Sequence, residues 1–331
     1  MTRTAKIKIA AGSAIALAFV PIVGFSMLSA NPPVGPVTPT ASTPLDTGWT
    51  QTEVVGGLVH PWAAAWLPGD DSTVLITERP GRLRVVEDGV LRPEPVEGLP
   101  RIASVGQGGL MDIKPHPDFE DNRLIYFAAA TGSRNANRTA LFRGAISEDL
   151  TRLDSVEELY RVKRDKSGGQ HFGAVIQFLD DGSLLLSIGD GGNPPVELDG
   201  DFIRKQAQNR ETSFGKVLRM TDTGDPHPDN PYADGPGDAP FVYTYGHRNV
   251  QGLAIRPGTD EIWATEHGAR GGDELNLIEP GNNYGWPEAT YSIEYWGPRI
   301  SDIATLEGAE DPRVVWTPCI APCGLIFYSG D

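Results

Sequence analysis

One hydrophobic pattern, which recurs five times along the chain, indicates the fold. Each repeat opens with a small or aromatic residue, continues with alternating apolar positions, turns at a Pro or Asp-Gly, and ends in a second β-rich run. The repeats start at Trp62, Gly109, Gly173, Gly252 and Gly324. Period-two alternation bounded by turn residues predicts a pair of antiparallel strands in each repeat.

The spacing of the repeats indicates which β-architecture they form. It is too long and irregular for a solenoid but suits four-stranded sheets with inserted loops, as in a β-propeller. The intervening runs ALFRGAISEDLTRL and GKVLRMTDTGD supply outer strands. Long helical periodicity is absent, and only residues 200–212 are expected to form a short helix, which disfavours a doubly wound α/β fold. We therefore predict an all-β propeller of four-stranded antiparallel sheets.

The fifth repeat stops at Asp331, where its second strand is due. A propeller closes on itself to protect its sheet edges. We therefore expect a propeller truncated before its last blade closes, with residues 319–331 left as an unpaired edge. A closed, fully paired sheet ending at Asp331 would contradict this expectation.

Composition and charge indicate how many turns the fold needs and which classes of molecule the protein can bind. The 39 Gly and 28 Pro residues are too many for a helical protein and require numerous turns. The formal net charge is −16, and such a surface repels phosphate groups. We therefore expect neither nucleic acid nor an anionic membrane surface as a partner, whereas bound cations are compatible with this charge.

The N-terminal residues have the order of a secretory signal. Arg3, Lys6 and Lys8 precede an apolar run from Ile9 to about Ala30. Residues 1–30 are therefore predicted to be a signal peptide, with an uncleaved membrane anchor as the alternative. Residues 31–47 form a Pro/Thr/Ser linker, and residues 48–331 form the propeller domain. The protein is expected to be exported to the periplasm or the extracellular space.

The two cysteines, Cys319 and Cys323, lie close together near the end of the chain. An exported protein can oxidise such a pair to a disulfide, and two free buried thiols are the alternative. The spacing carries no haem-attachment or zinc signal.

Two residues of the third repeat are candidates for proton transfer. His171 follows a Gly-rich turn just before a strand, and its ordinary pKa near 6.5 suits a base. Asp190 ends the hairpin partner of that strand, so its carboxylate is placed to orient the imidazole. The alternatives are a loop histidine bonded to backbone and a turn-capping aspartate.

Propeller symmetry brings further polar residues to the same rim. Gln107 occupies the equivalent position one repeat earlier, and Arg248 with Asn249 occupies it one repeat later. An arginine at a channel mouth in so acidic a protein is expected to meet an anionic ligand.

An acidic, Gly-rich turn suggests a metal. Glu266, Asp273 and Glu274 lie among glycines that expose backbone carbonyls. Hard oxygen ligands of this kind suit Ca²⁺. A solvated acidic turn is the alternative.

At these residues the chain resembles a known family. The segments that carry the resemblance are QGGLMDIKPHPDFEDNRLIYF, QHFGAV, IGDGG, AQNRETSFGKVLR, YGHRNVQGLA, EHGARGGDELNLI and NNYGWP, in this order. Together they resemble the soluble pyrroloquinoline-quinone (PQQ)-dependent aldose sugar dehydrogenases of the glucose/sorbosone dehydrogenase family. The resemblance implies a six-bladed propeller that binds PQQ and Ca²⁺ and oxidises the anomeric hydroxyl of a cyclic sugar to a lactone, passing electrons to an unidentified acceptor.

The resemblance also implies roles for individual residues. It makes His171 the general base, with hydride passing to the quinone, and Asp190 the acid that orients it. It assigns cofactor contacts to Gln107, Arg248, Asn249 and Tyr295. It assigns the catalytic Ca²⁺ to the backbone carbonyls of Gly268 and Ala269, and additional Ca²⁺ to Glu274 and Tyr284. Further basic cofactor contacts of the family lie beyond the fifth blade, where this chain ends.

Two other functions fit the same fold. A Ca²⁺-dependent propeller lactonase or hydrolase would share the fold, export and acidity, but needs side-chain carboxylates and Asn on the central axis, where only Asn249 is placed. A non-catalytic binding propeller would leave His171 without a role.

Overall fold

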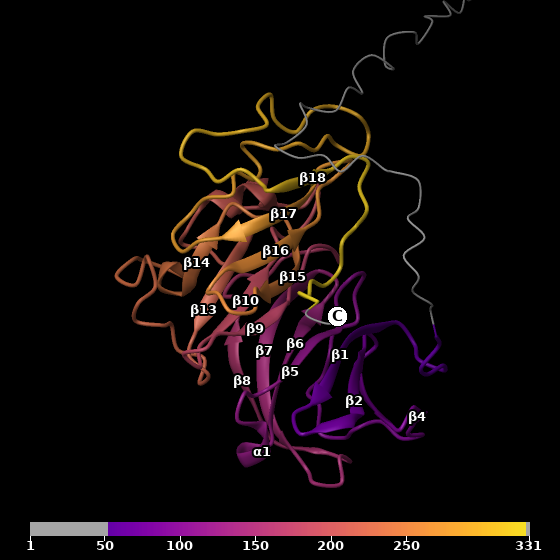
Figure 1. Cartoon of the computed structure of the whole chain (residues 1–331). Coiled ribbons are helices and arrows are strands. Elements are labelled where there is room, and N and C mark those ends of the chain that lie inside the picture. The colour runs from indigo at the N-terminus through magenta and orange to yellow at the C-terminus, as the bar shows by residue number, and fades with distance from the viewer. Residues whose placement is uncertain (1–51, 329–331) are drawn as a thin grey trace, which may run out of the picture.

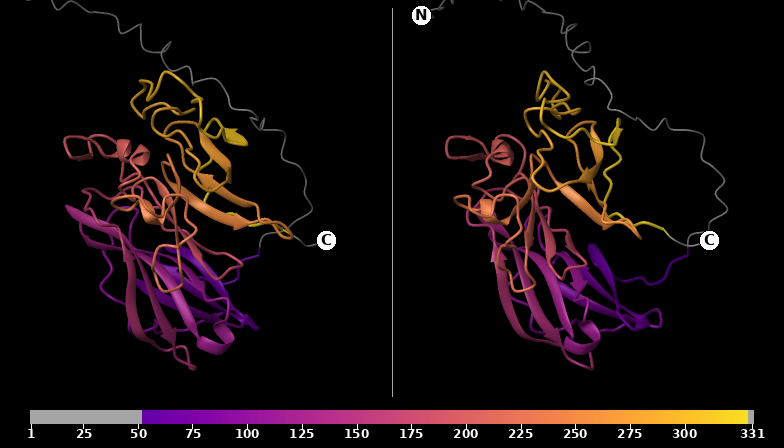
Figure 2. Two further views of the ribbon diagram at one scale, coloured as in Figure 1. Left: turned by 90° about the vertical axis from the view of Figure 1, so that its left-hand side faces the viewer. Right: turned by 60° about the vertical axis from the view of Figure 1, so that its left-hand side comes forward.

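Four four-stranded antiparallel sheets succeed one another along the chain in a computed structural model that describes residues 52–328 (Figures 1 and 2). The predicted signal peptide and linker lie outside the described residues. The sheets comprise β1 (Pro61–Leu67), β2 (Asp70–Glu78), β3 (Arg82–Glu87) and β4 (Val90–Leu91); β5 (Leu110–Pro115), β6 (Leu124–Ser133), β7 (Ala136–Ile146) and β8 (Leu153–Arg161); β9 (Ile176–Phe178), β10 (Leu184–Ile188), β13 (Lys216–Met220) and β14 (Val242–Tyr245); and β15 (Val250–Ile255), β16 (Ile262–Glu266), β17 (Asp273–Ile278) and β18 (Val314–Trp316).

Each sheet is a meander in which consecutive strands of the sheet pair in antiparallel register. The first four repeats of the sequence form the hairpins β1–β2, β5–β6, β9–β10 and β15–β16, as predicted. The intervening runs contribute β7 and β13, also as predicted. The all-β, propeller-like arrangement is therefore confirmed, with four sheets present.

The helical segments are short. They are α1 (Phe119–Asn122) and two 3₁₀ helices, η1 (Ile203–Gln208) and η2 (Ala239–Phe241). Residues 200–212, where a short helix was expected, contain η1, which follows a small hairpin of β11 (Glu197–Leu198) and β12 (Asp201–Phe202). Over residues 52–328, no helix has the length and apolar character needed to cross a membrane.

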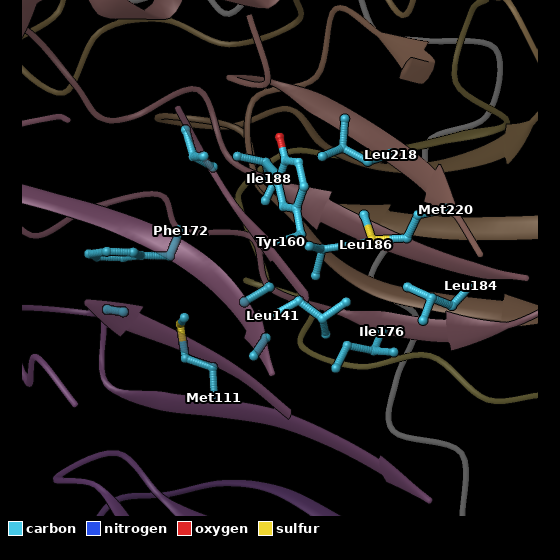
Figure 3. Packing of buried hydrophobic residues seen from close by; sticks show 14 of the residues in the cluster. Met111, Leu141, Tyr160, Phe172, Ile176, Leu184, Leu186, Ile188, Leu218 and Met220 are labelled. Carbon is cyan, nitrogen blue, oxygen red and sulfur yellow. The ribbon is translucent and has the colours of Figure 1, made fainter. Parts of the chain in front are cut away.

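The hydrophobic core lies between successive sheets, because alternate residues of a strand point to opposite faces. In β10, Leu184 and Leu186 pack toward the second sheet, whereas Leu185 between them packs toward the fourth. All three are fully buried. Figure 3 shows the cluster between the second and third sheets, where Met111 and Leu141 meet the β10 leucines. Burying each such side chain stabilises the fold by about 1.5–3 kcal/mol.

The described part of the fifth repeat forms no strand. Over residues 319–328, Gly324 donates its N–H to the Gln251 carbonyl at 2.9 Å, and Ile320 donates to the Asp273 carboxylate at 2.8 Å. Residues 323–326 line a cavity of about 410 Å³ together with residues 61–64 of β1 and residues 251–253 of β15. This end of the described chain therefore lies between the fourth and first sheets, as Figure 1 shows.

Candidate active site

His171 lies in the connection between β8 and β9, where the backbone is constrained. Its φ is +49°, and its N–H donates to Gln107 Oε1 at 2.8 Å. Gly189 packs so closely against it that a Cβ on Gly189 would fall 2.3 Å from the His171 carbonyl oxygen. The next residue, Phe172, is buried in the core between the second and third sheets. The His171 backbone is thus held by the buried Phe172 on one side and by Gln107 on the other.

His171 and Asp190 form a buried pair. The distance from His171 Nδ1 to Asp190 Oδ1 is 2.6 Å, and the side chains are 5% and 1% exposed. Asp190 Oδ1 also accepts the Gly192 N–H at 2.9 Å, and Oδ2 accepts the indole N–H of Trp286 at 2.8 Å. Asp190 lies two residues after the end of β10, so the hairpin brings the carboxylate back to His171, as the sequence predicted.

The electrostatics keep this imidazole neutral at neutral pH. Burial lowers the pKa of His171, and the positive charges of Arg248 and Lys166 lower it further, while Asp190 opposes them. No described residue forms a hydrogen bond to Nε2. With Nδ1 facing Asp190, Nε2 is the nitrogen that can accept a proton from a ligand.

Lys166 is a neighbour that sequence reasoning missed. Its ammonium lies 3.8 Å from the centre of the Phe172 ring and donates to the Gln170 carbonyl at 2.7 Å. Burial lowers the pKa of Lys166 to about 7, against the charge of Asp190. A lysine before a Gly-rich turn gives no sequence signal that separates it from a surface lysine.

Arg248 is almost fully buried, 2% exposed, and only partly satisfied. Its Nη1 donates to the carbonyls of His267, at 2.9 Å, and Gly268, and its Nη2 donates to Asn193 Oδ1 at 2.9 Å. Its Nε has no partner among the described residues. A buried guanidinium with a free donor can recognise an anionic group.

The other predicted rim residues lie nearby. Gln107 and Asn249 line a cavity of about 210 Å³ with Trp62, Phe172 and His267. Asn249 Oδ1 accepts the Gly173 N–H at 3.1 Å. The hydroxyl of Tyr295, a residue that is 56% exposed, lies 3.5 Å from Arg248 Nη2. The structure therefore brings Gln107, His171, Asp190, Arg248, Asn249 and Tyr295 to one side of the propeller-like arrangement.

The carboxylates of the acidic turn accept hydrogen bonds from nearby loops, and Glu266 lies opposite Glu274 in the pairing of β16 with β17. Glu266 accepts the backbone N–H groups of Arg248 and Asn249, the latter at 3.3 Å, and pairs with His247 Nδ1 at 2.8 Å. Asp273 accepts the Gly268 N–H at 2.8 Å. Within residues 52–328, no group of three or more His, Cys, Asp or Glu side chains is arranged to hold a metal ion. These carboxylates fix the loops, and calcium binding at this turn stays a prediction.

Two places can still accept a cation. Glu266, Glu274 and Tyr284 line a void of about 10 Å³, which is the size of one water-sized species. Burial and the nearby charge of Glu266 raise the pKa of Glu274 to about 8. The second place is at the carbonyls of Gly268 and Ala269, which receive the Arg248 guanidinium and the Cys319 thiol, the latter at 3.3 Å.

The cysteines are both free thiols. Of the two alternatives, the disulfide is therefore not formed. Cys319 is partly buried, and burial raises its pKa to about 12, whereas Cys323 is exposed. The expectation of two buried thiols is wrong for Cys323.

Comparisons with known proteins agree with this arrangement. The family model for glucose / sorbosone dehydrogenase matches residues 58–331. The aldose sugar dehydrogenase of Escherichia coli K12 is 36% identical over 277 residues, covering 83% of this chain and 72% of the relative. The apo structure of the E. coli soluble aldose sugar dehydrogenase superposes with a TM-score of 0.77, covering 83% of this chain and 77% of that one.

Two further relatives carry the cofactor in their names. The structure of the PQQ-bound form of an aldose sugar dehydrogenase from Streptomyces coelicolor is 32% identical with a TM-score of 0.66, covering 82% of this chain and 73% of that one. Quinoprotein glucose dehydrogenase B of Acinetobacter calcoaceticus is 30% identical over 260 residues, covering 71% of this chain and 51% of the relative.

Proposed function

Because the chain belongs to the glucose/sorbosone dehydrogenase family, we propose that it oxidises the anomeric hydroxyl of cyclic aldose sugars to lactones, with PQQ and Ca²⁺ as cofactors. The observation that carries this proposal is the buried His171–Asp190 pair beside the buried, partly unsatisfied Arg248. We include in the proposal the six-bladed propeller that the family resemblance implies, and export to the periplasm or the cell exterior.

His171 is the proposed general base. Its lowered pKa leaves Nε2 unprotonated at neutral pH, ready to take the proton of the anomeric hydroxyl. Asp190 holds the proton on Nδ1, fixes the tautomer and stabilises the imidazolium that forms. Gln107 fixes the His171 backbone through the 2.8 Å hydrogen bond to its N–H.

The residues present fit PQQ, which carries carboxylates. The Nε donor of Arg248 is buried and unpartnered, and such a donor is costly unless a ligand acceptor satisfies it. Gln107, Asn249 and Tyr295 are the further proposed contacts. When bound, PQQ supplies the oxidant that accepts the hydride from the sugar.

Ca²⁺ has two proposed locations. The carbonyls of Gly268 and Ala269 would hold the catalytic ion; the Gly268 oxygen already receives a cationic group, the guanidinium of Arg248. Glu274 and Tyr284, which line the ion-sized void, would hold a structural ion. Oxygen donors of this kind suit Ca²⁺.

A dye-coupled oxidation assay with a panel of aldoses tests the proposal. The full-length protein is assayed with and without PQQ and Ca²⁺, beside His171→Gln and a control, His227→Gln, whose histidine lies on the distant loop after β13 and accepts the Asp229 N–H. We expect PQQ-dependent turnover that falls about 10²-fold or more in His171→Gln, the typical contribution of a general base, and is unchanged in the control.

The outcomes separate the alternatives. Absence of PQQ-dependent turnover removes the dehydrogenase proposal. Lactone hydrolysis without any electron acceptor would point to a hydrolase, and ligand binding without turnover would point to a binding propeller.

A further inference from the structure

Among residues 52–328, the indole N–H of Trp286 is the one side-chain donor to Asp190 apart from His171. It donates to Asp190 Oδ2 at 2.8 Å, from a residue that is 5% exposed and far away in sequence. Asp190 Oδ1 remains for His171 Nδ1 and the Gly192 N–H. A carboxylate held through both oxygens cannot rotate, so its Oδ1 stays directed at the imidazole.

The indole of Trp286 also lies close to two arginines. The Arg248 guanidinium lies 5.4 Å from the ring centre and that of Arg204 lies 5.9 Å away. Arg204 is in turn fixed by a 2.6 Å ion pair with the buried Glu294. Trp286 itself is held by its backbone, because its N–H donates to the Gly246 carbonyl at 2.9 Å. The ring therefore touches the proton-transfer pair through its N–H and the anion-binding arginine through its face.

We propose that Trp286 is a positioning residue that couples the two halves of the site: its N–H holds Asp190 against His171, and its ring supports Arg248. This inference rests on the proposed function of His171 as the base. Trp286 belongs to the NNYGWP segment. Its proposed role is distinct from contacting the cofactor and from binding a metal.

The N–H contact can be removed alone or together with the ring contact. Trp286→Phe keeps an aromatic ring below Arg248 but removes the N–H, whereas Trp286→Leu removes both. The chain offers a matched control in Trp263→Phe, because the indole N–H of Trp263 also donates to a carboxylate, Glu261 Oε2 at 3.2 Å, at a remote and partly exposed position.

We expect Trp286→Phe to lower kcat by about 10- to 150-fold, the loss that corresponds to one hydrogen bond to a charged group. The dissociation constant for PQQ should stay within about threefold of the wild-type value, because the ring remains. Trp286→Leu should lower kcat and also weaken PQQ binding about fivefold or more. Trp263→Phe should change neither quantity. If Trp286 only stabilised the fold, its substitution would lower the stability of the protein. The effects on kcat and on PQQ affinity would then not separate between the two variants.

A second readout does not depend on turnover. The His171 imidazole proton shared with Asp190 is expected as a downfield resonance in the proton NMR spectrum of the apoprotein, assigned by its loss in His171→Gln. It should persist in Trp263→Phe and broaden, or move upfield, in Trp286→Phe. The charged groups that face His171 are Asp190, Arg248 and Lys166, and Trp286→Phe leaves all three in place. A change in the resonance therefore reports the freed carboxylate.

The result that overturns the proposal is an unchanged resonance together with an unchanged kcat in a folded Trp286→Phe protein. If that variant lacks the wild-type thermal transition, 3-benzothienylalanine placed at position 286, which keeps the bicyclic ring and lacks the N–H, carries the same test with the same outcomes. Should the wild-type protein show no PQQ-dependent turnover, the proposed function fails, and the resonance alone decides whether Trp286 positions the pair.

Discussion

Replacing Asp190 with Asn tests how the buried pair works. The carboxylate accepts from three donors: His171 Nδ1–H, the Gly192 N–H and the Trp286 indole N–H. An amide offers only one acceptor oxygen, so its NH₂ group must face either the Trp286 indole N–H or both His171 Nδ1 and the Gly192 N–H. Keeping the oxygen toward Trp286 turns the NH₂ toward His171, which favours the tautomer with the proton on Nε2 and removes the base.

The magnitude follows from the bond that is lost. A hydrogen bond to a charged partner contributes about 1.5–3 kcal/mol, which corresponds to about 10- to 150-fold in rate. We expect kcat to fall by this factor. The negative charge of Asp190 raises the pKa of His171 against burial and Arg248. Its removal therefore moves the acid limb of the kcat/KM profile to lower pH, because the imidazole is then even harder to protonate.

The assay is PQQ-dependent dye reduction measured from acid to neutral pH, with Asp199→Asn as the control. Asp199 is an exposed aspartate that pairs with Arg164 at the surface, at 2.6 Å. Wild-type kcat in Asp190→Asn, or an acid limb that moves to higher pH, would refute this account of the pair.

Three further predictions concern the cofactor, calcium and the fold. Arg248→Gln should weaken PQQ binding about tenfold or more, measured by fluorescence titration of the apoprotein, while Arg256→Gln at the exposed Arg256–Glu261 pair should not. Chelation of Ca²⁺ should lower the thermal midpoint by about 5 °C; Ca²⁺ but not Mg²⁺ should restore it, and Glu274→Gln should abolish the difference. Lys216→Met should cost about 3 kcal/mol in urea unfolding, because the fully buried Lys216 ammonium donates to three carbonyls at 2.6–2.9 Å; equal midpoints for this variant and the exposed Lys205→Met would contradict it.

The strand hairpins and the His171–Asp190 pair were readable from the sequence because both depend on local pattern. Alternating apolar residues fix which face of a strand is buried, and a hairpin necessarily returns Asp190 to His171. The repeat also placed Gln107 near His171, since equivalent positions of successive sheets meet at one rim. These parts of the site can be predicted from the hydrophobic periodicity of the strands and from the turn residues alone.

The remaining contacts were not readable because irregular loops make them. Trp286 reaches Asp190 from the loop after β17, and no periodicity specifies that approach. The acidic, Gly-rich composition of its turn suggests that Glu266 is a metal ligand. In the structure, however, Glu266 accepts the backbone N–H groups of Arg248 and Asn249. A carboxylate among glycines satisfies backbone donors or a cation equally well, and only the loop conformation decides between them.

The core between the second and third sheets extends directly to His171, the proposed base, because His171 and the buried Phe172 are neighbours in the chain. Any change of volume in that core shifts the spacing of two sheets and therefore the distance between His171 and its partners. Directed evolution for a faster or slower enzyme should accordingly find productive substitutions at interior positions such as Leu141 and Ile176. The geometry of the His171–Asp190 pair is adjustable from this packing.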